Sequence, residues 1–483
     1  MVIFLAKRII VRNSHIEITE YEGNSKLEHI LSAWDDKMHC PSIYAFIRKE
    51  DSLVIPSGFS LNYLKKILPD YKVIYSDKSD PYEIAVFKIN TEPRDKRQQT
   101  AIDFLSGSKD FYYLSESTQK ILALGTSIGK TYCTINYMSQ RNVRTLVIVD
   151  RKLLSVQWME EFMKFSNLKE TDFFFISGKQ SISKLMKKKN PQYKVYIAIH
   201  RTLQNLLTED EELLVDLFNH MKIGLKVVDE MHLYFENILK IDMITNTMET
   251  VYLSATPGRS AINENKLFTN CFNDVPTFGL AETTKNNEKY INLYYVRYNS
   301  KPSSEDLIKS KNYYGFNINQ FSSYSFVKKA HVILPILSDL IGQMFDKELK
   351  VAIIVHTLEQ VKILKGHLLD LDYSIEDIGI FCGLTKDDKL ADEADKRILI
   401  TTDKMLGSAL TIPELRCTIM TVPTSSEIVI KQIMGRLRKI GKTCFFMILT
   451  DHGFDACKKQ RTKISRTVED EAKNIFNVTK YLP

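Results

Sequence analysis

Residues 120–140 read KILALGTSIGKTYCTINYMSQ, and this stretch decides the fold. Its first five residues have the length and composition of a buried strand, and its last nine have the pattern of a helix. The loop between them can turn backbone N–H groups toward a phosphate at the positive end of that helix. The stretch therefore predicts a nucleotide site formed by Gly125, Thr126, Ser127, Ile128, Gly129, Lys130 and Thr131.

The last three residues of this loop have distinct expected roles. Gly129 allows close approach to the phosphates, Lys130 can reach the β- and γ-phosphates, and the Thr131 hydroxyl can ligate Mg²⁺. Leu124 stands where the full P-loop pattern has glycine, and an ordinary strand-to-helix turn is the alternative interpretation. The preferred ligands are ATP and Mg²⁺.

Short apolar runs recur outward from this stretch and alternate with amphipathic segments. In the first half of the chain they fall at 145–150, 193–199, 225–230 and 250–256, and in the second half at 350–357, 378–383, 397–402, 417–422 and 444–449. Such runs are typical of central strands in a parallel sheet that helices cover on both faces. The pattern predicts an α/β protein with two tandem domains of this kind.

The sequence VVDEMH at 227–232 is expected to complete the nucleotide site. Asp229 can hold Mg²⁺, Glu230 can act as the general base on the attacking water, and His232 can connect the site to other motifs. A solvated strand end is the alternative. The order of the two motifs, strand–GKT–helix followed by strand–DExH, favours the functional interpretation.

The bulk composition excludes several classes of protein. Hydrophobic residues make up 44% and charged residues 26% of the 483, as in soluble globular proteins. The net charge of +7 is compatible with a polyanion partner without requiring one. No stretch approaches the roughly 20 apolar residues of a membrane span, and the seven cysteines include no CxxC pair. We expect a cytoplasmic monomer with no membrane partner.

Taken in order, the motifs resemble those of superfamily 2 DExH helicases over about residues 91–450. Asp229–His232 resembles motif II, and Ser254, Ala255 and Thr256 resemble motif III, which couples hydrolysis to movement. Gln98 resembles the adenine-reading glutamine. Gln432 and Arg436 resemble motif VI, which places a glutamine and an arginine at the γ-phosphate. The resemblance implies two RecA-like domains and gives Glu230, Gln432 and Arg436 catalytic roles.

The second arginine of motif VI is displaced in this chain. Lys439 stands at its usual position and Arg438 lies one residue earlier. A lysine cannot form a planar two-pronged contact, so we favour Arg438 as a further catalytic residue.

The resemblance also implies contacts to nucleic acid, made mostly to phosphates because a motor must pass any sequence. The candidate residues in the first domain are Arg151, Lys152, His200, Arg201 and Thr202, and those in the second are His356, Thr357, Thr401 and Thr402. A solvated surface role is the alternative for each of them.

The domain boundaries follow from changes in the pattern. Residues 1–90 are predicted to form a small α+β domain that selects the DNA substrate, and residues 91–283 the first RecA-like domain. Residues 284–330 are polar and are predicted to form a linker or insertion, followed by the second RecA-like domain at 331–483.

The stretch 42–75 is similar to the domain that precedes the motor in the phage UvsW-type group, which also includes XPB-like and RecG-like enzymes. That similarity implies unwinding or branch migration of branched DNA during recombination, replication or repair. The alternatives are a viral type of transcript-release or RNA-directed helicase, and an ATP-binding scaffold with weak turnover.

Overall fold

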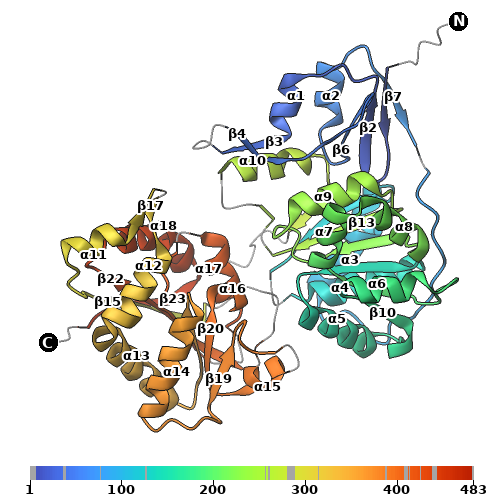
Figure 1. Cartoon of the computed structure of the whole chain (residues 1–483). Coiled ribbons are helices and arrows are strands. Elements are labelled where there is room, and N and C mark those ends of the chain that lie inside the picture. The colour runs from blue at the N-terminus through green and yellow to red at the C-terminus, as the bar shows by residue number, and fades with distance from the viewer. Residues whose placement is uncertain are drawn as a thin grey trace, which may run out of the picture. The chain divides into compact units, whose positions relative to one another are not determined.

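The computed structural model of this chain describes residues 7–35, 40–76, 78–125, 128–255, 257–258, 262–279, 289–313, 315–386, 389–406, 412, 414–424, 426–437 and 443–480. The chain divides into two compact units, Met1–Glu282 and Thr283–Pro483. The first unit holds a small sheet and a seven-stranded sheet, and the second holds another seven-stranded sheet (Figure 1).

The small sheet lies at the start of the first unit. Its order is β5 (Ile47–Arg48), β6 (Ser52–Pro56), β2 (His15–Thr19), β1 (Arg8–Val11) and β7 (Lys72–Tyr75), with α1 (Ser25–Ile30), α2 (Leu61–Ile67) and a hairpin of β3 (Ser32–Asp35) and β4 (Cys40–Tyr44). Only the β1–β7 pair of this sheet is parallel. The alternating strand β2 buries Ile16 and Ile18 and leaves the intervening Glu17 partly exposed. The small α+β domain predicted to precede the motor is therefore present.

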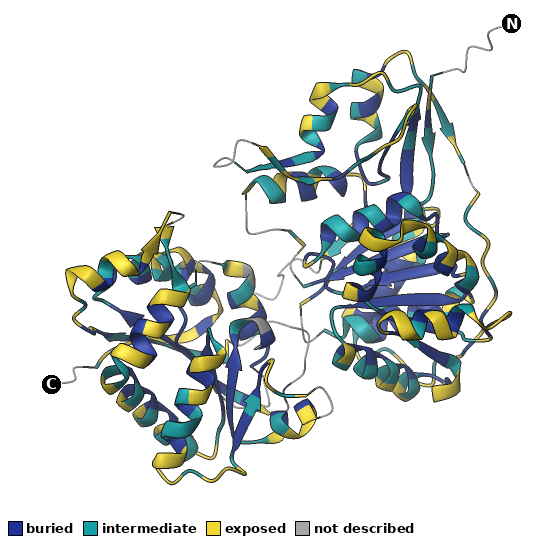
Figure 2. Ribbon diagram, in the orientation of Figure 1, coloured by how far each residue is buried: buried dark blue, intermediate teal, exposed yellow. Residues whose placement is uncertain are grey.

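The first large sheet is entirely parallel. Its order is β10 (Phe173–Ile176), β11 (Val195–Ile199), β9 (Thr145–Val149), β12 (Leu225–Val228), β13 (Glu249–Ser254), β8 (Gln119–Ala123) and β14 (Thr277–Gly279). Every residue of β9, β12 and β13 is buried, which requires cover on both faces of the sheet (Figure 2).

The helices of the first large sheet separate its strands along the chain, as the alternating pattern predicts. They are α3 (Lys96–Ser106), α4 (Lys130–Arg141), α5 (Lys152–Phe165), α6 (Lys179–Met186), α7 (His200–Glu209), α8 (Glu211–Met221), α9 (Phe235–Ile244) and α10 (Ile262–Cys271), with short 3₁₀ turns at Lys109–Leu114 and Glu170–Asp172.

The second large sheet is also entirely parallel. Its order is β19 (Ile378–Phe381), β20 (Ile398–Thr402), β18 (Lys350–Val355), β21 (Leu415–Met420), β22 (Cys444–Asp451), β15 (Ile291–Tyr298) and β23 (Ala472–Thr479). The predicted class, α/β with two tandem parallel sheets after a small α+β domain, is confirmed. β15 lies inside the segment 284–330, which was predicted to be a linker or insertion. Residues 291–298 of that segment are instead a strand of the second sheet.

The remaining elements of the second unit surround this sheet. They are α11 (Ser304–Lys309), α12 (Ile318–Ser323), a π-helical turn at Tyr324–Lys328, α13 (Ala330–Phe345), α14 (Leu358–Asp370), α15 (Leu390–Asp395), α16 (Asp403–Leu406), α17 (Glu427–Met434) and α18 (Asp455–Glu471), with a hairpin of β16 (Lys311–Asn312) and β17 (Gly315–Phe316).

The small sheet and the first large sheet share one hydrophobic core. Ile16 and Leu53 of the small sheet belong to the same buried cluster as Phe268 and Phe272 of the segment that includes α10. The contact is close, because a side chain added at Gly58 would place its Cβ 2.5 Å from the Cys271 carbonyl oxygen. The small sheet is therefore packed into the first unit.

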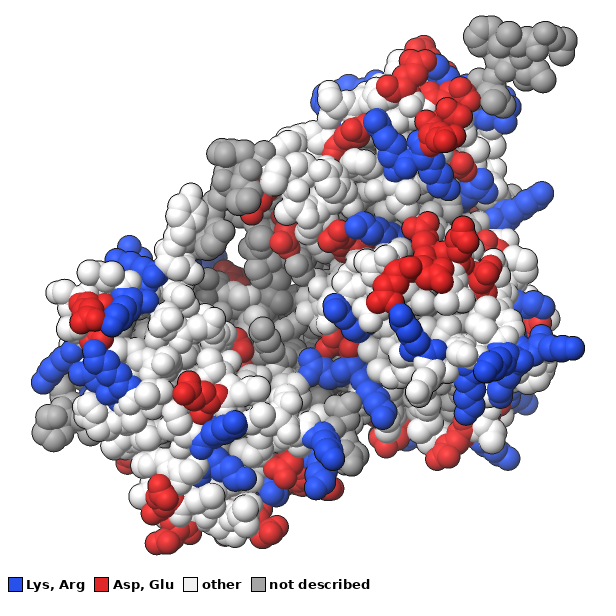
Figure 3. Space-filling view, viewed as in Figure 1, with Lys and Arg blue, Asp and Glu red and all other residues white. Residues whose placement is uncertain are grey.

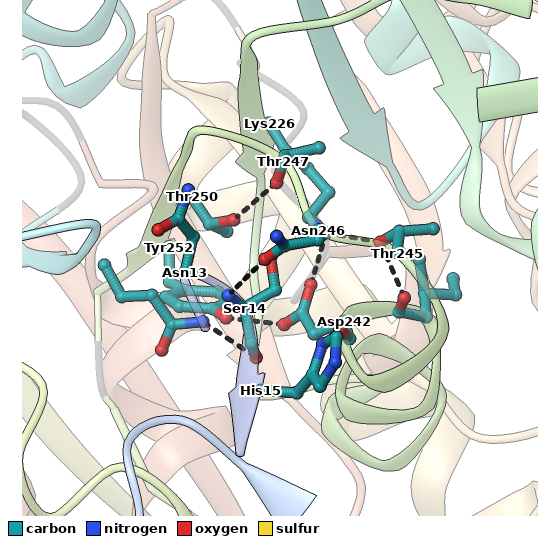
Figure 4. Close-up of polar contacts among 12 residues, drawn as sticks. Asn13, Ser14, His15, Lys226, Asp242, Thr245, Asn246, Thr247, Thr250 and Tyr252 are labelled. Atoms are coloured by element: carbon teal, nitrogen blue, oxygen red, sulfur yellow. Dashed lines mark hydrogen bonds and ion pairs between the residues drawn. The ribbon is translucent and has the colours of Figure 1, made fainter. Parts of the chain in front are cut away.

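A buried polar cluster also joins these two sheets (Figure 4). Lys226 of β12 forms an ion pair with Asp242 of α9, and the exposed fractions of these side chains are 0% and 1%. The Tyr252 hydroxyl donates to the other Asp242 carboxylate oxygen at 2.5 Å. From the small sheet, the His15 ring lies 3.2 Å from the Asp242 carbonyl oxygen through Nδ1, and the Ser14 N–H donates to Asn246 at 3.3 Å.

An extended strap, residues 78–90, connects the small sheet to the rest of the unit. Its backbone bonds to segments that precede four strands: Asp80 N–H to the carbonyl of Asn246, Glu83 N–H to Lys222, Ala85 N–H to Asn142 and Asn90 N–H to Phe165. These partners lie before β13, β12, β9 and β10. The strap thus runs along the amino ends of the strands and leaves their carboxyl ends open for a site.

Candidate nucleotide and nucleic-acid sites

The loop between β8 and α4 ends at a glycine in the left-handed region. Gly129 caps α4 with a φ of 96°, in the left-handed region that favours glycine. A Cβ at this position would lie 2.5 Å from the Gln98 amide nitrogen. Leu124, which replaces the glycine of the full P-loop pattern, is completely buried and serves the core. Thr126 and Ser127 lie outside the described residues.

Gln98 supports this loop from α3. Its amide nitrogen donates to the Ile128 carbonyl oxygen at 2.8 Å, and its amide oxygen accepts the Arg94 N–H at 2.8 Å. Asp95 caps α3 by accepting the N–H groups of Arg97 and Gln98. The structure therefore brings the predicted adenine-reading glutamine into direct contact with the loop predicted to bind phosphate.

Lys130 and Glu230 face each other at the carboxyl ends of β8 and β12. The Lys130 ammonium lies 3.5 Å from a Glu230 carboxylate oxygen, and the two side chains are 11% and 9% exposed. Among the described residues the Lys130 ammonium makes no hydrogen bond, so its proton donors remain available for a ligand. Glu230 has a φ of 49°, which is unfavourable for a residue with a side chain. Such strain is concentrated at functional sites.

Asp229 lies next to this pair and is held from two sides. One carboxylate oxygen accepts the Trp158 indole N–H at 3.0 Å, and the other accepts the Glu230 backbone N–H at 3.0 Å. Burial, and then the Glu230 carboxylate, raise the pKa of Asp229 to about 6, although Lys130 acts in the opposite direction. Two adjacent carboxylates, of which Asp229 has a raised pKa, fit a divalent cation, because the cation would offset both charges. Thr131 and Asp229 are the residues that would hold Mg²⁺.

His232 joins the loop after β12 to the end of β13. Its Nδ1 lies 2.9 Å from the Ser254 hydroxyl and 3.5 Å from a Glu230 carboxylate oxygen. Both His232 and Ser254 are buried. The structure thus brings together the predicted motif II and motif III residues. Ala255 follows directly, and Thr256 lies outside the described residues.

The candidate nucleic-acid contacts of the first unit follow β9 and β11, which are adjacent strands. Lys152 and Arg201 are exposed, and Arg151 is partly exposed. His200 and Thr202 are instead buried, with exposed fractions of 1% and 8%. The Thr202 hydroxyl accepts the Gly178 N–H at 2.9 Å and thereby holds the turn after β10. Neither buried side chain can reach a phosphate in this conformation.

Several candidate residues in the second unit are also buried or already have side-chain partners. Thr401 and Thr402 end β20 and are buried. The Thr357 hydroxyl caps α14, and the His356 ring lies 3.7 Å from the Asp403 carboxylate. Gln432 of α17 and Arg436 just after it are 8% and 6% exposed. Arg438 and Lys439 lie outside the described residues.

Three residues near these sites could not have been found by motif matching. Trp158 has the helical spacing of a core residue, and it is 3% exposed, but its indole also binds Asp229. Tyr234 and Asp150 form a hydrogen bond between the segments that follow β12 and β9. Their partners lie 71 and 84 residues away in sequence, so only the fold reveals the contacts.

Comparison with known proteins agrees with this geometry. Residues 90–259 match the family described as type III restriction enzyme, res subunit (ResIII). No curated protein sequence gives a significant match. The structure is similar to Saccharomyces cerevisiae Dbp5 bound to RNA and ADP BeF3, with a TM-score of 0.55, 15% identity, 80% of this chain covered and 89% of that chain. A Dbp5 variant with the same ligands gives a TM-score of 0.54, 16% identity, and coverage of 80% and 94%.

Phage T4 UvsW aligns over 99% of both chains at 16% identity, but its TM-score of 0.37 is too low to carry an inference. The chain therefore shares with Dbp5 the fold of tandem RecA-like domains. Its first RecA-like domain contains the ResIII helicase-family match.

Among the described residues, no helix combines the length and the apolar character required to cross a bilayer.

Proposed function

We propose that this chain is an ATP-dependent DNA helicase or translocase that unwinds or branch-migrates branched DNA. The observation that carries the ATPase part is the arrangement of Lys130, Asp229 and Glu230 beside a left-handed Gly129. The preference for branched DNA rests on the sequence similarity of residues 42–75 to the UvsW-type group. An RNA-directed helicase is the second candidate, because Dbp5, which shares the fold, was solved with RNA.

Each residue of the nucleotide site has a distinct task in this proposal. Lys130 binds the β- and γ-phosphates, while Thr131 and Asp229 hold Mg²⁺. Glu230 accepts a proton from the attacking water. A bound Mg²⁺ would supply charge neutralisation for the transferred phosphoryl group. Gln432, Arg436 and Arg438 of the second unit are proposed to assist hydrolysis, since an arginine at the γ-phosphate stabilises the charge that builds there.

The proposed contacts to nucleic acid combine exposed and buried residues. Arg151, Lys152 and Arg201 provide charge for phosphate contact in the first unit. His200 and Thr202 would act there by shaping the loops that carry them, because both are buried. Figure 3 shows basic and acidic side chains interspersed on the face in view, rather than one basic band. This distribution is compatible with a grip built from a few local phosphate contacts.

The test is the ATPase rate at fixed ATP with single-stranded DNA, a four-way DNA junction, single-stranded RNA or no nucleic acid. Stimulation by DNA, greatest with the junction, is the expected result and would justify strand-displacement assays. Stimulation by RNA alone would establish the second candidate. ATP binding without turnover in any tube would make the chain an ATP-binding scaffold.

Variants test the residue assignments directly. Lys130→Ala should abolish turnover, and Glu230→Gln should lower it by a factor of about 10² or more because it removes the general base. Glu230→Gln should keep binding a fluorescent ATP analogue. The matched controls are Lys179→Ala and Glu209→Gln, which break an exposed ion pair on α6 and α7. Normal turnover in either site variant would contradict the assignment.

A further inference from the structure

Tyr234 connects three neighbouring strand ends of the first large sheet. It precedes α9 and follows the DEMH sequence after β12. Its hydroxyl donates a hydrogen bond to Asp150, which follows β9. Its ring stacks on His200, which follows β11, with the ring centroids 3.8 Å apart and the planes at 12°. Because β11, β9 and β12 are adjacent in the sheet, one side chain holds all three ends together.

Asp150 is the centre of this arrangement because its two carboxylate oxygens have different partners. One accepts the Tyr234 hydroxyl. The other accepts the Arg151 guanidinium through Nε at 2.9 Å and through a terminal nitrogen at 2.8 Å. Burial, together with the Asp150 carboxylate, raises the pKa of Tyr234 to about 12, so the phenol remains a donor at neutral pH. The orientation of Arg151 thus depends on a carboxylate that Tyr234 fixes.

His200 provides a flat ring surface in this cluster. Its side chain is buried, and neither ring nitrogen has a hydrogen-bond partner among the described residues. Burial lowers the pKa of His200 to about 4, so the ring is neutral near pH 7. A neutral, buried ring stacked on Tyr234 restrains the phenol to one plane, and this keeps its hydroxyl directed at Asp150.

The same loop begins at the nucleotide site. Glu230 and Leu233 close a tight turn through the Leu233 N–H and the Glu230 carbonyl oxygen at 2.9 Å. Glu230 also has the unfavourable φ of 49° described above. A movement of Glu230 on binding or hydrolysis of nucleotide would therefore be passed through a short turn to Tyr234, four residues later.

We propose that Tyr234 is a positioning residue that couples the DEMH loop, residues 229–232, to the contact between Arg151 and the phosphates of a nucleic acid. It does so by fixing the Asp150 carboxylate that orients the Arg151 guanidinium. The inference rests on the proposed function and deepens it, since it names the connection between hydrolysis and grip in the first unit. Tyr234 itself touches neither the nucleotide nor the nucleic acid in this scheme.

The test uses the full chain and the variant Tyr234→Phe, which keeps the stacked ring and removes only the hydroxyl. The ATPase rate is titrated with poly(dT) and with poly(rU). The matched control is Tyr295→Phe, which removes a 2.9 Å hydrogen bond from a tyrosine hydroxyl to the Glu469 carboxylate in the second unit. Melting temperatures of both variants verify that each is folded.

In Tyr234→Phe, kcat and KM for ATP without nucleic acid should stay within about twofold of the wild type. The nucleic-acid concentration for half-maximal stimulation should rise about fivefold, the usual effect of losing one hydrogen bond. Asp150→Asn should also raise the nucleic-acid concentration for half-maximal stimulation. The double variant should show no more than the larger single effect, because both changes interrupt one connection.

Two results would overturn the inference: an unchanged half-saturation in Tyr234→Phe, or an equal loss of ATPase with and without nucleic acid. Either result alongside normal stimulation of the wild type would leave the proposed function intact. A wild type that is stimulated neither by these polymers nor by a four-way DNA junction would overturn both proposals together.

Discussion

Breaking the buried Lys226–Asp242 ion pair should strongly destabilise the first unit. The two side chains are 0% and 1% exposed, so Lys226→Met leaves the Asp242 carboxylate without its cation in a region that water does not reach. Removal of one member of a buried pair costs roughly 3–5 kcal/mol. The Tyr252 hydroxyl bond to Asp242 remains and offsets only part of this cost.

Replacing both charges should recover most of that loss, because the double variant Lys226→Met/Asp242→Leu buries no charge. It leaves the Tyr252 hydroxyl without its partner, which should keep the double variant about 1–3 kcal/mol below the wild type. Adding Tyr252→Phe removes this unpaired hydroxyl and should recover part of the remainder. The free energy of unfolding should therefore be highest in the wild type and decrease in the order triple variant, double variant and single variant.

The assay is urea unfolding followed by tryptophan fluorescence. The chain has only two tryptophans, Trp34 and Trp158, and both belong to the first unit, so the signal reports on that unit alone. A loss below about 1 kcal/mol in Lys226→Met would refute the reasoning, given the 3–5 kcal/mol expected for a broken buried pair. So would a double variant that is as unstable as the single one.

Three further outcomes are expected. Gly129→Ala adds a Cβ at a φ of 96° and 2.5 Å from the Gln98 amide nitrogen, which should raise the half-saturating ATP concentration by roughly tenfold; an unchanged value would contradict the close packing of this loop. Burial lowers the pKa of His15 to about 4, so the neutral ring stabilises the fold above about pH 6.5 and this contribution is lost as the pH falls through 4. Between those pH values the unfolding free energy of the wild type should therefore fall by roughly 3 kcal/mol more than that of His15→Gln. Parallel profiles of unfolding free energy against pH for the two proteins would contradict this. Deletion of residues 1–77 exposes the hydrophobic core that these residues share with Phe268 and Phe272. Each large side chain uncovered should cost about 1.5–3 kcal/mol of unfolding free energy. The deletion should therefore lower the urea midpoint of the tryptophan fluorescence transition or cause aggregation.

The sequence was most informative where strands are buried on both faces. The run at 145–150 became β9, which is buried throughout, and the run at 250–256 became β13. β15 was missed because Asn292, Tyr294 and Arg297 alternate with its buried residues. One face of this strand is only partly covered, so its sequence lacks the continuous apolar run that marks the central strands.

The candidate site shows the same limit of local patterns. Lys130 and Glu230 lie together because parallel strands end at one edge of a sheet, which follows from the predicted topology. The burial of His200 and its stacking on Tyr234 depend on side-chain packing between loops, which no motif encodes. The roles of these residues in hydrolysis and in contact with nucleic acid remain predictions.

The place of β15 in the second sheet has a consequence for synthesis on the ribosome. This strand is made first in its unit, yet it pairs with β22 and β23, which are made last. Its partners begin more than 150 residues downstream, as Ile291 pairs with Cys444 and with Ala472. Contacts so distant in sequence form slowly. The second unit should therefore close only after nearly all of the described chain has been translated, which exposes β15 to chaperones during elongation.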